Sequence, residues 1–326
     1  MSYTTVTTTL SFRSKLRIIL LRTFFKRLQS LIGKMSPHRF ADLQLKGASG
    51  VQSEYCGLPQ RCQVIGNVPG SWIGNNSENQ RVILYLHGGA FLFPASARLQ
   101  LPLLARLCMD LGASGFMPDY RLLPNHPFPA ALDDCESAYQ GLLNAGYRSE
   151  NIICMGESAG GTLVLSLLHR LKRHNLPMPQ CAVPISPCTD FGGAHRLPSR
   201  WLNTKREVLI PSSTFNNMLL WYVNAQDASH PEISPLFGDY SGFPPLLFVA
   251  SNDEILRDDS LLSFERACES GVQAELKLWT ELPHAFPIFE GNFPEAGIAR
   301  VEIVRFIEQL NMAKDKNPAT TQGNDP

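Results

Sequence analysis

The 326-residue sequence lacks the long apolar run that a membrane-spanning helix needs. Its helix-forming N-terminal stretch has no uninterrupted apolar run longer than Ile18 to Leu21, whereas a span needs about 20 residues. Charges also interrupt this stretch too often for the apolar region of a secretory signal peptide. We therefore expect a cytoplasmic protein, and the possibility that it associates with a membrane stays open.

The sequence also has no excess of positive or negative residues. The sum of Lys and Arg is 29, and so is the sum of Asp and Glu, so the formal net charge is zero. Proteins that bind nucleic acid through the phosphate backbone usually carry a basic surplus. The composition thus argues against a nucleic-acid partner. The oligomeric state leaves no signal in the sequence.

The eight cysteines show no pattern of a metal site or a redox motif, because no CxxC pair and no metal-type Cys/His spacing occurs. Cys154 and Cys181 lie in apolar runs and are expected in the core, whereas Cys56 and Cys62 could pair under oxidising conditions. A reducing compartment is favoured. We expect no metal and no organic cofactor.

Strand and helix signals alternate from residue 81 onward. Short apolar runs predict strands at 81–87, 113–120, 151–155, 181–186, 244–251 and 274–279. Between and after them, helices are predicted at 99–112, 130–146, 158–175, 263–271 and 296–310. This alternation indicates the α/β class, with a mostly parallel central sheet and helices on both faces.

The length suits one large domain with additions at both ends. We expect a basic helical segment at 1–45 that forms a cap, and a main α/β domain at 46–312. An aromatic-rich stretch near 190–225 breaks the alternation and is expected to be a cap insertion. Residues 313–326 are polar and are expected to form a disordered tail.

The first 41 residues contain eight basic residues, and the first acid is Asp42. A lid helix that packs on the main domain is the favoured interpretation. A helix on a membrane surface is a second one, since Phe24 and Phe25 beside basic residues suit an interface. An organelle-targeting segment is a third. Apolar and basic positions are not cleanly separated on a helical wheel, which weakens the second and third.

The stretch GESAGG places a serine between a predicted strand and a predicted helix. Gly156-Glu157-Ser158-Ala159-Gly160 fits the G-x-S-x-G pattern, in which a sharp turn needs small residues two places before and after the serine. Such a turn lifts the hydroxyl clear of the sheet, and the helix N-terminus favours developing negative charge. Ser158 is therefore the predicted nucleophile.

A glycine pair follows the first predicted strand, in His87-Gly88-Gly89-Ala90. Such a loop accompanies the serine turn in lipases and esterases and supplies backbone N–H groups to an oxyanion. The predicted donors are Gly88, Gly89 and Ala90, together with Ala159. We expect His87 to shape the loop rather than to act as a base.

The remaining groups should follow the chain order serine, acid, histidine. His284 lies in a loop after the last predicted strand and is the expected general base. The acid should follow the preceding strand, where the candidates are Asp253, Glu254, Asp258 and Asp259. Residue types alone do not separate these four, because the imidazole needs only one carboxylate.

With these residues the chain resembles the hormone-sensitive-lipase-like, GDXG-type esterases of the α/β-hydrolase superfamily. The likeness rests on HGGAF, DYRLLPNHPFPAALDD, GESAGG, NDEILRDD and LPHAF, and it spans about residues 80 to 310. It implies an α/β-hydrolase fold with a helical cap. The family's acid-x-Leu-x-acid motif matches Glu254 to Asp258, so the likeness implies Glu254 as the acid and Asp258 as its support. Most relatives carry Asp at this place, so Asp253 remains a rival.

The resemblance implies a serine carboxylesterase that hydrolyses a small or medium carboxylic ester through an acyl-enzyme. It implies a buried polar anchor at Asp119, Tyr120 and Arg121. An acyltransferase or an amide deacetylase with the same triad is one alternative. A non-catalytic ligand receptor, like the plant gibberellin receptors, is another, but these lose the catalytic histidine and this chain keeps His284. The acyl and alcohol preference is not predicted.

Overall fold

The computed structural model of the protein describes residues 3–7, 9–25, 54–75, 81–193 and 196–316. The expected boundary near residue 45, part of the N-terminal helical segment and most of the expected tail lie outside these ranges.

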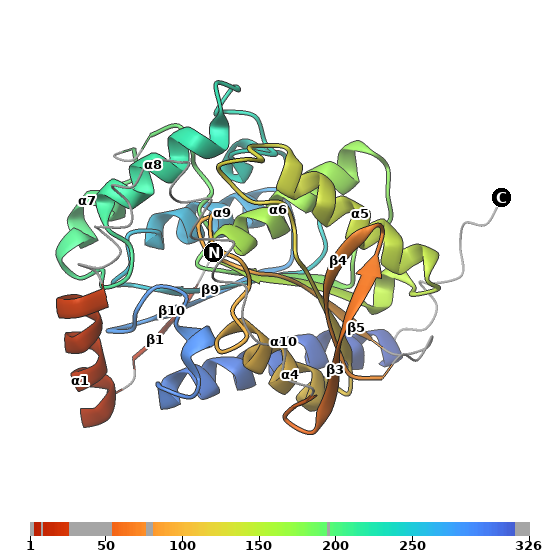
Figure 1. The fold of residues 1–326 in the computed structure, drawn as a ribbon, viewed down its shortest axis with the longest axis horizontal. Coiled ribbons are helices and arrows are strands. Elements are labelled where there is room, and N and C mark those ends of the chain that lie inside the picture. Colours follow the sequence, from red (N-terminus) through yellow and green to blue (C-terminus); the bar gives the residue numbers. More distant parts are fainter. Residues whose placement is uncertain (1–2, 8, 26–53, 76–80, 194–195, 317–326) are drawn as a thin grey trace.

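The described residues form one ten-stranded sheet in the order β1-β10-β9-β8-β7-β5-β6-β4-β3-β2 (Figure 1). The strands are β1 Thr4–Val6, β2 Glu54–Tyr55, β3 Leu58–Ile65, β4 Val68–Ile73, β5 Val82–Leu86, β6 Ser114–Pro118, β7 Ile152–Glu157, β8 Cys181–Ile185, β9 Leu246–Ser251 and β10 Ala274–Trp279. Pairing is parallel from β6 through β5 to β10 and β1, and antiparallel among β2, β3, β4 and β6. The expected α/β fold with a mostly parallel sheet is confirmed.

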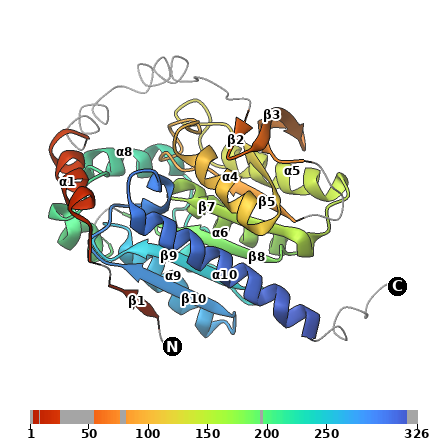
Figure 2. The same cartoon turned by 90° about the horizontal axis from the view of Figure 1, so that it is seen from below.

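Helices cover both faces of the sheet. They are α1 Phe12–Leu20, α4 Gln100–Leu111, α5 Ala130–Asn144, α6 Ala159–Arg173, α7 Ser199–Leu202, α8 Ser212–Val223, α9 Arg257–Glu269 and α10 Pro294–Lys316. The short turns are the π-helix η1 Leu21–Phe25 and the 3₁₀ helices η2 Ser149–Asn151, η3 Asn203–Lys205, η4 Pro235–Phe237 and η5 Phe286–Phe289. Helices α4 and α10 lie on one face, α5, α6 and α9 on the other, and α7 and α8 lie above the latter (Figures 1 and 2).

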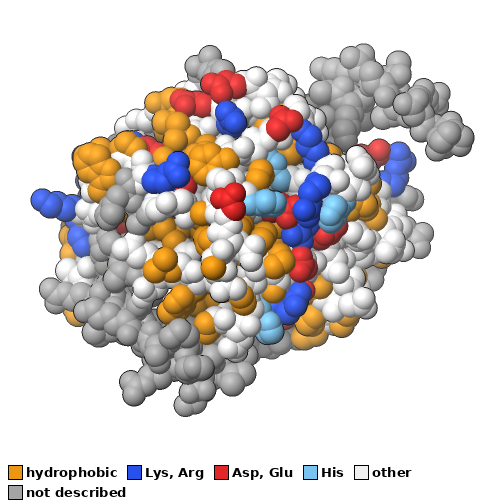
Figure 3. Space-filling view, turned by 90° about the horizontal axis from the view of Figure 1, so that it is seen from above, with side chains coloured by type: hydrophobic (Ala, Val, Ile, Leu, Met, Phe, Trp, Pro, Cys, Tyr) orange, Lys and Arg blue, Asp and Glu red, His pale blue; other side chains and the backbone are white. Residues whose placement is uncertain are grey.

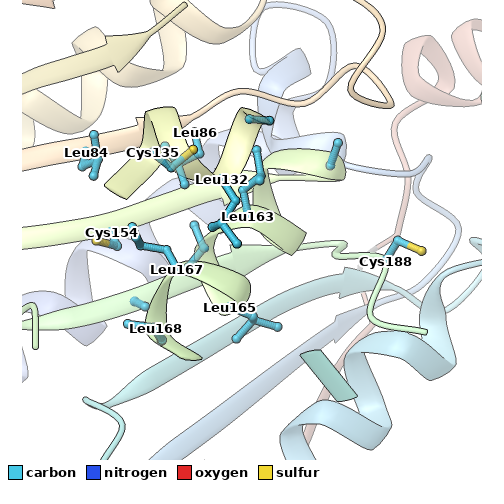
Figure 4. Packing of buried hydrophobic residues seen from close by; sticks show 14 of the residues in the cluster. Leu84, Leu86, Leu132, Cys135, Cys154, Leu163, Leu165, Leu167, Leu168 and Cys188 are labelled. Carbon is cyan, nitrogen blue, oxygen red and sulfur yellow. The ribbon is translucent and has the colours of Figure 1, made fainter. Parts of the chain in front are cut away.

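The core lies in two apolar layers, one on each face of the sheet. In the layer under α6, Leu163 and Leu167 meet Leu84 and Leu86 of β5 and Leu132 of α5 (Figure 4). Apolar residues recur along α6 at the spacing of one helix face, which is why this helix seats on the central strands. Burial of this kind fixes the carboxyl ends of β5 and β7, where the GESAGG turn lies.

Four features differ from the sequence-based expectations or extend them. Strands β1 to β4 were not predicted. In β3 polar and apolar residues alternate, so the sequence shows no apolar run there. Helix α10 continues to Lys316, into the expected tail. In the expected anchor only Tyr120 is buried, and Asp119 and Arg121 are exposed. The 190–225 stretch forms α7, η3 and α8.

Candidate active site

Ser158 lies in the turn between β7 and α6, with φ 56° and ψ −121°. A positive φ is unfavourable for a residue with a side chain, so the turn holds Ser158 under strain. A Cβ at Gly156 would lie 2.5 Å from the Leu86 carbonyl oxygen, and one at Gly160 would lie 1.9 Å from the same oxygen. Because Gly156 and Gly160 have no side chain, the turn can pack directly against the end of β5.

Glu254 and His284 follow β9 and β10, neighbouring parallel strands whose carboxyl ends meet at one edge. Both side chains are buried, and the Glu254 Oε2 atom forms a short hydrogen bond with Nδ1 of His284. The second carboxylate oxygen, Oε1, accepts the Ser251 N–H at 2.7 Å and the Ser186 hydroxyl at 2.8 Å. Glu254 is thus fixed at both oxygens, with one of them on the imidazole.

The three other candidate acids make different contacts. Asp253 accepts from the Arg206 guanidinium at 3.0 Å and from the Glu281 N–H at 2.6 Å. Asp258 accepts the Ser199 N–H of α7 at 2.7 Å, and Asp259 forms a fully buried ion pair with Arg200 of α7. The geometry joins Glu254, and not Asp253, to His284. Asp258 and Asp259 lie in the first turn of α9 and instead attach the cap helix α7 to that helix.

The outer nitrogen of His284, Nε2, is buried and has no hydrogen-bond partner among the described residues. Burial by itself lowers the pKa of His284. The charge of Glu254 and its hydrogen bond raise this pKa by more than burial lowers it, so the pKa lies above its ordinary value. Together with Ser158, His284 lines a cavity of about 340 Å³. Nε2 is therefore placed to exchange a proton with a group that enters this cavity.

The cavity walls are mostly apolar. Helix α8 contributes Phe215 and Met218, the glycine loop contributes Phe91 and Phe93, and η5 contributes Phe289. Tyr222 of α8 stacks on Phe91 with ring centroids 3.9 Å apart, which fixes the cap helix over the loop. A pocket of this kind excludes water and takes an apolar acyl or alcohol group.

The Gly88 N–H donates to Oε1 of Glu157 at 2.6 Å, so it is not available to an oxyanion. This corrects the predicted donor set, in which Gly88 was included. Gly89 and Ala90 follow with φ 118° and 56°, and both line the cavity, as does Ala159 in the first turn of α6. These three backbone groups remain the predicted donors.

Glu157 is a functional candidate that sequence reasoning missed. Its buried carboxylate accepts from Gly88 and also from the Gln100 side chain at 2.9 Å. Burial raises the pKa of Glu157 to about 7, although the hydrogen bonds from Gln100 and Gly88 lower it. The signal was present as an acid directly before the nucleophile, but nothing in the sequence pairs it with the glycine loop.

Replacing Glu157 by glutamine should change how stability depends on pH. The native pKa of about 7 lies above the ordinary value of 4.5, so the folded state keeps this proton longer than the unfolded chain. Glu157 therefore costs stability progressively as pH rises from about 4.5 to 7. Relative to the parent, Glu157→Gln should gain about 2 to 3 kcal/mol in unfolding free energy between pH 5 and pH 8, measured in urea. Identical pH dependence in the two proteins would contradict the assigned shift.

Ser186 is a second residue that the sequence did not reveal. It directly follows β8 with φ 46°, and its hydroxyl donates to Glu254 while accepting the Ala285 N–H at 3.2 Å. A parallel link joins the Ser251 hydroxyl to the Leu282 carbonyl at 2.5 Å. Two hydroxyls thus tie the acid-bearing loop to the histidine-bearing loop.

Replacing Ser186 by alanine should lower kcat for a soluble ester about tenfold with little change in KM. One hydrogen bond to a charged carboxylate is worth about this factor, and the imidazole loses its fixed orientation. Steady-state kinetics measure the effect. Ser260→Ala is the matched control, because its buried hydroxyl has no partner among the described residues. Equal kcat values in the two variants would show that Ser186 does not contribute to catalysis.

His87 makes contacts that shape the glycine loop. Its Nδ1–H donates to the Gly88 carbonyl at 2.7 Å, and its ring stacks on Tyr120 with centroids 4.2 Å apart. Burial lowers the pKa of His87 to about 4, although the Gly88 bond raises it, so the ring is neutral. The Tyr120 hydroxyl donates to the His87 carbonyl at 2.6 Å. These contacts fit a structural role for both residues.

Within the described ranges, no group of three or more His, Cys, Asp or Glu side chains is arranged to hold a metal ion. Cys56 and Cys62 are both exposed and form no disulfide with each other. Among the described helices, none combines the length and the apolar character that crossing a membrane requires.

Several known proteins resemble this chain in sequence and fold. The model of a family described as alpha/beta hydrolase fold matches residues 83–288. An acetyl-hydrolase of Streptomyces hygroscopicus is 31% identical over 81% of this chain and 86% of its own length. A carboxylesterase/phospholipase of Mycobacterium tuberculosis is 34% identical over 73% of this chain and 64% of its own. The crystal structure of a hormone-sensitive lipase homologue from a metagenome library superposes with TM-score 0.79 and 31% identity, covering 93% of this chain and 99% of the other.

Proposed function

Because this chain belongs to the hormone-sensitive-lipase-like esterases of the α/β-hydrolase superfamily, we propose that it is a serine carboxylesterase. Its substrate is a small or medium carboxylic ester, cleaved through an acyl-enzyme. The observation that carries the proposal is the buried Glu254–His284 pair on the apolar cavity that His284 and Ser158 both line, with His284 Nε2 left without a partner among the described residues.

In the proposed first step, Ser158 Oγ attacks the ester carbonyl carbon while His284 Nε2 takes the hydroxyl proton. Glu254 stabilises the imidazolium through Nδ1. The oxygen that becomes negative receives N–H bonds from Gly89, Ala90 and Ala159, each worth about 10²- to 10³-fold in rate. The C–O bond then breaks, and Nε2 returns the proton to the leaving alcohol.

In the second step, water enters and His284 removes its proton as the oxygen attacks the acyl carbon. The ester bond to Ser158 breaks, the serine recovers its proton from Nε2, and the carboxylic acid leaves. The α8 side chains Phe215 and Met218 line the cavity in which the acyl or alcohol part would lie. We assign substrate preference to this cap and to the residues around 190–225.

The pH profile should follow His284, because only the neutral imidazole accepts a proton. Glu254 holds the pKa of His284 above its ordinary value of 6.5, so kcat/KM should fall as pH drops through this raised pKa. Glu254→Gln removes the charge, and its acid limb should move to lower pH. Initial rates between pH 5 and 9 measure both profiles, and superimposable acid limbs would contradict the assignment.

The proposed function is tested by turnover of p-nitrophenyl butyrate with product analysis. Release of butyrate in water supports hydrolysis, whereas transfer of most acyl groups to an added short alcohol at low concentration favours an acyltransferase. The corresponding p-nitroanilide tests amide cleavage. No turnover of any of these would favour a non-catalytic ligand-binding protein.

A further inference from the structure

The outward face of α1 carries an apolar strip. Phe12 is 82% exposed, Leu16 48% and Ile19 55%. These positions recur at three- and four-residue spacing and therefore share one side of the helix. The opposite side faces the body, where the buried Ser14 hydroxyl donates to Glu295 of α10 at 3.0 Å. Ile18 packs against the core from that side.

Basic side chains flank the strip on both sides. At about 100° per residue, Arg13 falls on one edge of the strip and Lys15 on the other, and Arg17 lies between Arg13 and the side that faces the body. No acid occurs in the first 41 residues, so positive charge next to the strip is not balanced within this segment.

Further apolar surface lies beside α1. Arg22 of η1 donates to the Arg206 carbonyl at 3.4 Å, which places this part of the chain next to the end of η3. On α7, just before η3, Trp201 is 51% exposed and Leu202 58%. Phe24 of η1 is 72% exposed. Looking down onto the cap, Figure 3 shows apolar side chains gathered toward the end where α7 lies in Figure 1.

This apolar surface borders the active-site edge of the sheet. Lys15, Ile18 and the edge residue of the strip, Ile19, line a second cavity, of about 600 Å³, with Leu282 and Pro283. The latter two directly precede His284 in the chain. Any partner that binds the exposed face of α1 therefore lies close to the loop that carries His284, the proposed base.

We propose that α1, η1 and α7 dock onto the surface of a lipid bilayer that contains anionic phospholipid. The apolar strip enters the boundary between headgroups and acyl chains, and Arg13, Lys15 and Arg17 meet lipid phosphates. The positive charge beside the strip favours an anionic membrane over the two other partners that could cover this surface. A second copy of α1 would bring the same basic residues and be repelled. Residues 26–41 of this chain add four more basic residues and no acid, so they are equally mismatched.

The test is co-sedimentation of the full chain with vesicles of phosphatidylcholine alone or with a quarter of phosphatidylglycerol. The parent protein should bind the anionic vesicles at low salt and dissociate from them at high salt. It should not bind vesicles of phosphatidylcholine alone. Leu16→Ser with Ile19→Ser should weaken binding at least about tenfold. Arg13→Glu with Lys15→Glu should weaken it by about fivefold or more for each residue.

The matched control is Ile298→Ser with Val301→Ser on α10, two apolar side chains of similar exposure, 49% and 47%. This variant should bind like the parent. Thermal unfolding confirms that every variant is folded. The catalytically disabled Ser158→Ala should still bind, which separates this proposal from the proposed function.

Three results would overturn the proposal. The first is no binding of the parent to anionic vesicles. The second is unchanged binding by both α1 variants. The third is a parent dimer in light scattering that Leu16→Ser with Ile19→Ser converts to a monomer, since the strip would then be an interface between copies.

Discussion

Replacing Ser158 by alanine should lower kcat for p-nitrophenyl butyrate by roughly 10⁵- to 10⁶-fold, because the attacking oxygen is lost and no acyl-enzyme can form. KM should change little, since the apolar cavity that binds the acyl group is untouched. The residual rate reflects the oxyanion donors and substrate positioning alone. Steady-state kinetics with highly purified protein measure this difference.

The matched control for this variant is Ser166→Ala on the same helix. The Ser166 hydroxyl is buried without a hydrogen-bond partner among the described residues, so its removal should leave kcat within about threefold of the parent and not lower stability. A Ser158→Ala protein that keeps a tenth or more of the parent activity would mean that another group is the nucleophile.

The second large effect is expected from a pair of neighbouring acids. Glu254→Gln should lower kcat by roughly 10³- to 10⁴-fold, because the neutral amide cannot stabilise the imidazolium and can hold the wrong tautomer. Asp253→Asn should stay within about threefold, since Asp253 contacts Arg206 and the Glu281 N–H rather than His284. The two variants remove the same charge from adjacent positions, so long-range electrostatics alone cannot produce a large difference between them.

Interpretation of this pair needs both proteins folded, which melting temperature and circular dichroism establish. The reverse result, full activity in Glu254→Gln and loss in Asp253→Asn, would move the acid to Asp253. Equal losses in both variants would point to a shared effect on the loop after β9 instead of a specific role for either carboxylate.

The sequence predicted much of the fold because apolar runs and helical periodicity are local signals. The strands β5 to β9 are short and fully buried, β10 is half buried, and each stands out from its flanking loops. Strand β3, next to the short edge strand β2, carries Gln60, Arg61 and Gln63 between apolar residues, so it has no such run. Topology followed from the alternation, whereas the antiparallel edge did not.

The residues of the candidate site also fall into those that the sequence predicted and those that it did not. Ser158 and His284 were named from a steric motif and a chain order, and the structure places both on one cavity. The four acids after β9 could not be separated by residue type, because which carboxylate meets the imidazole depends on the path of the loop. Ser186 and Glu157 act across 68 and 69 positions of sequence, on Glu254 and Gly88, and hydrogen bonds of that range leave no spacing pattern.

The central claim is that the Ser158 hydroxyl becomes a nucleophile through His284. It is tested most directly by treating the protein with diethyl p-nitrophenyl phosphate and mapping the adduct by mass spectrometry. One diethylphosphoryl group on the Ser158 peptide, formed as activity is lost and absent in His284→Asn, is the predicted result. Complete loss of activity with the adduct on another residue, or full activity with Ser158 modified, would contradict it.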